Sequence, residues 1–123
     1  MKQFLLLLHE DIEKMENLSP KEMEELANAH MTWAEKLAES GHLISGDGLQ
    51  QKGVLISGKN SVVKDGPYLE SKEIIGGYYL LQAQNLETIV ELTKECPCHF
   101  WGGTTEIRQI MDMADYEQSN CRN

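Results

Sequence analysis

His30 is the residue of this chain best suited to acid–base chemistry. It lies in the apolar stripe of a predicted helix, with Leu26 four residues before it and Ala34 four residues after it. A buried imidazole prefers to be neutral, and a nearby carboxylate would bring its pKa back toward physiological pH. Asp47, at the end of the strand predicted after that helix, could be this carboxylate. The alternative is a core histidine with a single hydrogen-bond partner.

A second group of polar residues lies in residues 65–79, DGPYLESKEIIGGYY. A turn that runs extended at Gly66, or takes a form only glycine allows, precedes a charged run and a strand. Charged side chains of this stretch could bind a polar ligand at a pocket mouth: Asp65, Glu70, Lys72 and Glu73. The alternative is structural, because Asp-Gly-Pro stabilises a turn by itself and charged runs are often only solvated.

The cysteines offer little further chemistry. Zinc sites need four converging ligands, and the run Cys96-Pro97-Cys98-His99 has no second ligand pair in the sequence. Cys96 is expected instead to be the last inward residue of a helix. Three cysteines give no disulfide framework, which favours a reducing, cytoplasmic compartment. Motifs of serine hydrolases, nucleotide-binding proteins and metalloproteases are absent, so we predict neither metal nor cofactor.

Composition limits the possible partners. The 123 residues are 41% hydrophobic and 25% charged, as in a soluble single domain. A net charge of −9 without a Lys/Arg cluster argues against nucleic-acid binding. The apolar run 4–8 is too short for a signal peptide, and no run is long enough to span a membrane.

Apolar patterning and turn residues predict the elements that position these side chains. Ser19 and Glu22 form a capping box at the start of the first helix, and Gly41 ends it. The predicted strands are 4–8, 42–45, 54–57, 61–64, 77–82 and 104–110, and the second helix is 86–95. Residues 9–18 are expected to be a loop, Gly46-Asp47-Gly48 a sharp bend, and 112–123 a loose polar tail. The expected inward residues of the two helices are Met23, Leu26, Ala27, His30, Trp33, Ala34 and Leu37, then Leu86, Ile89, Val90 and Thr93.

The strands predict a second copy of the chain as a partner. Two helices of this size cover only one face of a sheet. Residues 4–8 and 78–81 are nevertheless apolar on both faces. The same face of another copy is the simplest way to bury the remaining surface, so we predict a homodimer.

The DGP-aromatic turn, the following Ser71-Lys72-Glu73 and the glycine-led strand together resemble the YCII-like family in its DGPF-domain branch. The resemblance implies an α+β fold over residues 1–111: a ferredoxin-like antiparallel sheet with two helices on one face, paired as a dimeric α/β barrel. The family has a histidine on the first helix, matched by His30, and an aspartate beyond the next strand, matched approximately by Asp47. Arg108 matches a family arginine, although Gln109 replaces the proline that follows it.

Two functions follow from the resemblance. The first is binding of a small organic molecule in a helix–sheet cleft, with a cofactor-free lyase-like or isomerase-like step. His30 would be the acid or base, supported by Asp47 or Asp65, with Glu70, Lys72 and Arg108 as ligand-binding residues. The alternative is a non-enzymatic regulatory module associated with sigma factors, whose acidic surface would dock a basic protein.

Overall fold

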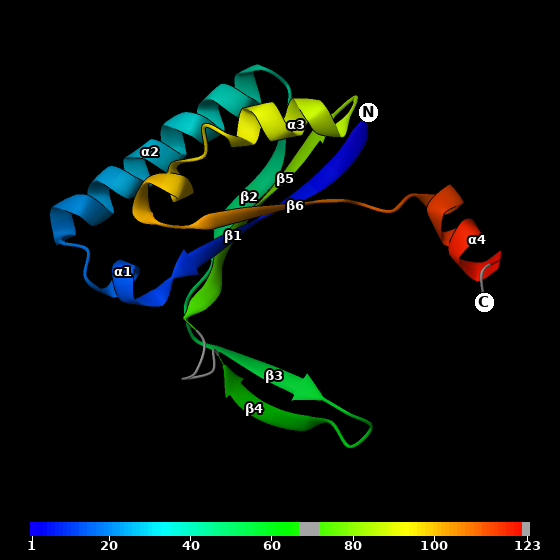
Figure 1. Cartoon of the computed structure of the whole chain (residues 1–123), viewed down its shortest axis with the longest axis horizontal. Coiled ribbons are helices and arrows are strands. Elements are labelled where there is room, and N and C mark those ends of the chain that lie inside the picture. The colour runs from blue at the N-terminus through cyan, green and yellow to red at the C-terminus, as the bar shows by residue number, and fades with distance from the viewer. Residues whose placement is uncertain (67–71, 122–123) are drawn as a thin grey trace.

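The computed structural model describes residues 1–66 and 72–121, with side chains placed up to residue 117. Its main sheet is antiparallel, with strand order β2-β5-β1-β6. These strands are β1 (Lys2–Asp11), β2 (Leu43–Gly48), β5 (Glu73–Ala83) and β6 (Thr104–Gln109). Figure 1 shows α2 (Pro20–Glu39) and α3 (Leu86–Thr93) on one side of this sheet. The order β1-α2-β2-β5-α3-β6 makes the unit ferredoxin-like, as predicted.

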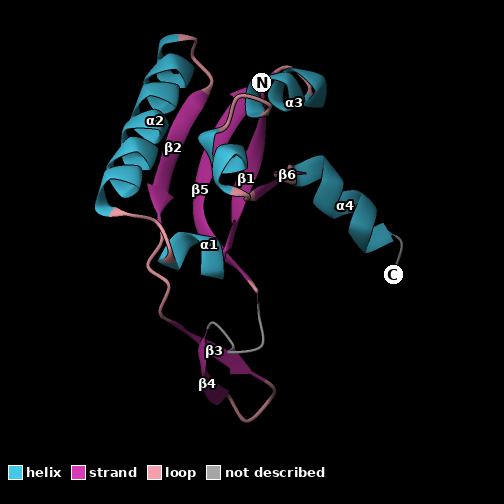
Figure 2. Cartoon of the chain, turned by 60° about the vertical axis from the view of Figure 1, so that its left-hand side comes forward, coloured by secondary structure: helices cyan, strands magenta, loops and turns pink. Residues whose placement is uncertain are grey.

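The remaining elements lie outside this unit. They are α1 (Ile12–Glu16), β3 (Gly53–Ser57), β4 (Val62–Gly66), the 3₁₀ helix η1 (Pro97–Trp101) and α4 (Met113–Cys121). Figure 2 shows the β3–β4 hairpin apart from the main sheet. The predicted hairpin is confirmed, with Gly58 at a φ of 77° in its turn. Gly66 belongs to β4 with no positive φ, and the rest of the predicted turn, including Glu70, lies outside the described residues.

Local sequence signals set both ends of α2 and the start of α3 as predicted, whereas α3 ends at Thr93 and not at the predicted Glu95. At the start of α2, Ser19 Oγ accepts a hydrogen bond from the Glu22 backbone N–H, and the Glu22 side chain accepts one from the Ser19 N–H. Asn85 caps α3 by accepting from the Thr88 N–H at 2.9 Å. Gly41 follows α2 with a φ of 80°, in the region that favours glycine.

The core lies between the main sheet and its helices. The alternating residues Phe4, Leu6 and Leu8 of β1 are buried on this side. Their core neighbours are Tyr79 and Leu81 of β5, Trp33 and Leu37 of α2, and Ile89 of α3. The intervening Leu5 and Leu7 are half-buried. With Tyr78 and Leu80, their register partners on β5, they form what we call the open face, on which none of the described helices is packed.

Several predicted elements are wrong in their bounds. Residues 9–18 are not one loop, because β1 continues to Asp11 by pairing with β5 and Asp11 then caps α1. The predicted bend at Gly46 lies inside β2, where pairing with Tyr79 keeps it extended. Residues Met113–Cys121 form a helix in place of a loose tail. Four residues expected to face inward are exposed: Met23, Ala27, Leu86 and Val90.

In the described part of the chain, no helix is both long and apolar enough to cross a membrane.

Candidate functional site

A cleft of about 420 Å³ lies between α2 and the main sheet. It is lined on the helix side by Ala27, His30, Met31 and Ala34, and on the sheet side by Leu8, Glu10, Gly46, Asp47, Gly48, Gly76, Gly77 and Tyr79. A smaller cavity also borders Glu10 and His30 and extends toward Cys98 and Trp101. The predicted stripe of α2 therefore does bring His30 to a cavity.

His30 is held by Tyr79. The His30 Nδ1 and Tyr79 Oη atoms are 2.8 Å apart. The Trp33 ring meets the Tyr79 ring edge-on, with centroids 5.0 Å apart, and so fixes the phenol from α2. Burial lowers the pKa of His30 and raises that of Tyr79. The two side chains thus form a neutral pair near pH 7, and Nε2 is the imidazole nitrogen left for a ligand.

Glu10 is the site residue that the sequence did not reveal. The register between β1 and β5 shifts between Leu8 and His9, which leaves Gly76 without a partner on β1. A Cβ on Gly76 would overlap the Glu10 carboxyl group, so the glycine provides the space in which this carboxyl lies. Burial raises the pKa of Glu10. Glu10 is therefore a desolvated carboxyl group in the same cleft as His30.

His30 and Asp47 both line the cleft, but they have different hydrogen-bond partners, Tyr79 for His30 and Tyr78 for Asp47. Asp47 is opposite Tyr78 in the sheet, and its Oδ2 accepts a hydrogen bond from the Tyr78 hydroxyl at 3.3 Å. Neighbouring residues of a strand point to opposite faces, so Tyr78 and Tyr79 diverge. The Asp47 carboxylate accordingly lies at the open face, while His30 lies with Tyr79 on the helix side.

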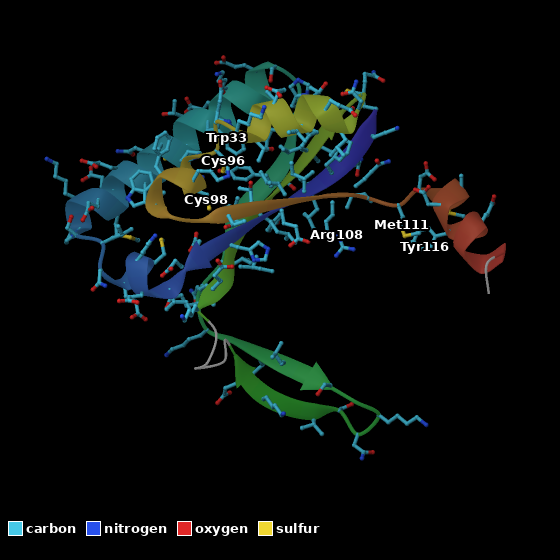
Figure 3. The ribbon with its side chains drawn as sticks, viewed as in Figure 1. Trp33, Cys96, Cys98, Arg108, Met111 and Tyr116 are labelled. Carbon is cyan, nitrogen blue, oxygen red and sulfur yellow. The ribbon has the colours of Figure 1, made fainter. Side chains whose placement is uncertain are left out.

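Three of the predicted ligand-binding residues are described, and none of the three lines the cleft. Arg108 is opposite Leu5 in the register and is exposed, and Figure 3 shows it on the side of β6 away from α2 and α3. Asp65 is exposed on the hairpin, and Lys72 is exposed just before β5. Neither lines the cleft as described. Glu70 is among the residues not described.

The two cysteines whose side chains are described, Cys96 and Cys98, are buried thiols of the core (Figure 3). Burial raises the pKa of Cys96 to about 11 and that of Cys98 to about 12, so both stay protonated and unreactive near pH 7. His99 instead pairs with Thr105 Oγ1, 2.9 Å from its Nε2. Within residues 1–66 and 72–117, no three His, Cys, Asp or Glu side chains come together as a metal site.

Replacing Gly76 with alanine should displace the Glu10 carboxyl group. Because the group in the way is the end of a flexible side chain, we expect a stability loss of only about 1 kcal/mol. Ligand affinity at the cleft should fall by at least about tenfold, or about 1.4 kcal/mol. Urea unfolding and titration with cleft ligands measure the two effects.

Gly48→Ala is the matched control, because its added Cβ would meet only the Gly76 carbonyl oxygen at 3.9 Å. Gly48 borders the same cleft, and a side chain there would not crowd Glu10. Equal affinity losses in the two variants would show that the Glu10 position does not matter.

The geometry defines an α+β protein of ferredoxin-like architecture with a histidine-bearing cleft between its long helix and its sheet. Its sequence matches the YCII-related domain family over residues 3–114, and the chain belongs to this family. A comparison with curated proteins gave no match. The family match does not resolve the narrower DGPF-domain branch, which stays a prediction.

Proposed function

We propose that the cleft binds a small organic molecule and that Glu10 and His30 exchange protons with it. The observation that carries this proposal is the presence of a neutral imidazole and a desolvated carboxyl group in one cavity of about 420 Å³. A cavity of this size, mostly apolar with a few converging polar groups, is typical of small-ligand sites. Perturbed pKa values in such a cavity further favour acid–base work.

The protonation states suggest distinct roles. Because the Tyr79 phenol stays protonated, the simplest arrangement has its O–H donating to His30 Nδ1, which leaves Nε2–H as a donor to the ligand. Glu10, with its raised pKa, is suited to accept a proton from carbon or oxygen. In a lyase-like step Glu10 would take the proton, the C–H electron pair would form the new double bond, and the departing group would leave with its own pair, aided by Nε2–H.

The charge of the cleft restricts the ligand class. Its described lining includes Glu10 and contains no lysine or arginine. The net charge of the chain is −9. An anionic ligand would be repelled by both, so a neutral or cationic molecule fits better than a carboxylate or a phosphate.

A fragment screen by NMR tests this proposal. Uncharged aromatic compounds and amines should give hits that shift the signals of His30, Tyr79 and Glu10, whereas carboxylates should give few. Hits confined to other surfaces, or hits dominated by anions, would contradict it. The sigma-factor-associated alternative has only the acidic surface in its favour and would instead show a stoichiometric basic protein in a pull-down.

We further propose that the protein acts as a cytoplasmic homodimer joined through the open face. Leu5 lies opposite Leu80 and Leu7 opposite Tyr78, which places apolar side chains side by side on that face. Leu5→Glu should therefore give a folded monomer at micromolar concentration in sedimentation velocity. Ala38→Glu, on the exposed side of α2, adds the same charge and should leave the dimer intact. A wild-type protein that sediments as a monomer would rule the homodimer out.

A further inference from the structure

The β3–β4 hairpin exposes apolar side chains on both of its faces. We call residues 52–66 the β-arm. On one face Ile56 lies opposite Val63, with Val54 two residues away, and these side chains are 65%, 60% and 61% exposed. On the other face Leu55 and Val62 are 43% and 49% exposed. A two-stranded hairpin is marginally stable alone in water, so an arm this apolar needs a surface to pack on.

The charge of the β-arm indicates which kind of surface the arm would pack on. Three lysines, Lys52, Lys59 and Lys64, against one aspartate, Asp65, give the arm a charge of +2. The rest of the chain has eight basic and nineteen acidic residues and therefore carries −11. The arm is thus complementary in charge to the body of the same protein, and an identical chain supplies that body in a symmetric pair.

The position of the β-arm agrees with such a pairing. Figure 1 shows the arm on the side of the main sheet away from α2 and α3, which is the side of the open face. A second copy packed on the open face would therefore lie on the same side as the arm. One partner can therefore bury two apolar surfaces of the described chain, the arm and the open face.

We propose that the β-arm packs its Val54–Ile56–Val63 face against the body of a second copy of this chain, with Lys59, in the hairpin turn, near that copy's acidic groups. In a twofold pair each chain both gives and receives an arm. The inference rests on the proposed homodimer and adds to it a second interface, with its own side chains and its own salt dependence.

Charge reversal tests the β-arm. Lys59→Glu, which occurs twice in a twofold pair, should raise the dimer dissociation constant by at least about tenfold in about 0.1 M salt, and by much less in about 1 M salt, where charges are screened within about 3 Å. Lys21→Glu is the matched control, because it changes the net charge equally from the helix side. The control should change the constant by less than about threefold. Sedimentation equilibrium gives these constants.

Ile56→Asp tests the apolar contact separately. The side chain is largely exposed in the single chain, so the variant should keep native circular dichroism while the dissociation constant rises by at least about tenfold. If both arm variants keep the wild-type constant while Leu5→Glu separates the subunits, the arm inference is wrong and the homodimer stands. A monomeric wild-type protein would overturn both.

Discussion

Replacing His30 with glutamine is expected to weaken cleft ligands by at least about tenfold and to reduce any turnover by a factor of about 10² to 10⁴. Glutamine can still reach Tyr79 by a hydrogen bond but cannot exchange a proton near neutral pH. The ligands are the hits of the fragment screen, and affinity is measured by NMR titration. Met23→Gln, on an exposed part of the same helix, is the control and should bind as the wild type does.

The pH dependence of stability offers an independent check on His30. Burial holds its pKa below 6.5 in the folded state, so the unfolded chain binds more protons as the pH falls through 6.5. The contribution of neutral His30 is complete above pH 6.5 and is lost as the pH falls toward the folded pKa. Glu10 affects stability in the opposite direction. Because burial raises its pKa, the folded state loses stability as the pH rises above 4.5.

His30→Gln should therefore flatten the loss of stability between about pH 6.5 and pH 5, measured by urea unfolding at each pH. If the variant followed the wild-type pH curve, the imidazole would have to be solvated, and the neutral pair with Tyr79 would be wrong.

The second large effect concerns the two faces of β1. Leu6 is fully buried against the helices, and Leu6→Ala should cost about 2–5 kcal/mol in unfolding free energy. Leu7 is the next residue, half-buried on the open face. Leu7→Ala should cost about 1 kcal/mol in a monomeric state, with a further loss in dimer affinity. Chemical unfolding at several protein concentrations separates the two losses.

One result for these neighbouring leucines would contradict the prediction. Equal and concentration-independent costs for Leu6→Ala and Leu7→Ala would mean that both faces are buried within one chain. The open face, and with it the proposed pairing of two copies, would then have no basis.

Much of the fold was predictable because its signals are local. The caps at Ser19 and Asn85 and the left-handed glycine at position 41 act on adjacent backbone groups, and they set the helix ends correctly. The apolar run 4–8 identified the central strand β1. The helix Met113–Cys121 was missed because its mean hydropathy and its weak apolar periodicity give little signal.

The site was less predictable, because two of its features depend on strand register. Asp47 was expected to support His30, but its pairing with Tyr78 puts its carboxylate on the open face of the sheet. A change of one residue in strand register would move a side chain to the opposite face, and the sequence does not reveal the register. Glu10 was missed because a shift in pairing between β1 and β5 brings it to the cleft. The only trace in the sequence is the Gly76-Gly77 pair, where the absence of a side chain makes room for the carboxyl group.

A crystal structure of the protein soaked with its best fragment hits is the most direct test of the cleft. We predict ligand density between α2 and the main sheet, within hydrogen-bond distance of His30 Nε2 and in contact with the Glu10 carboxyl group. Density found only elsewhere, for example in the groove beside Trp33 and Trp101, with the His30 cleft left empty at saturating ligand, would contradict the proposed site.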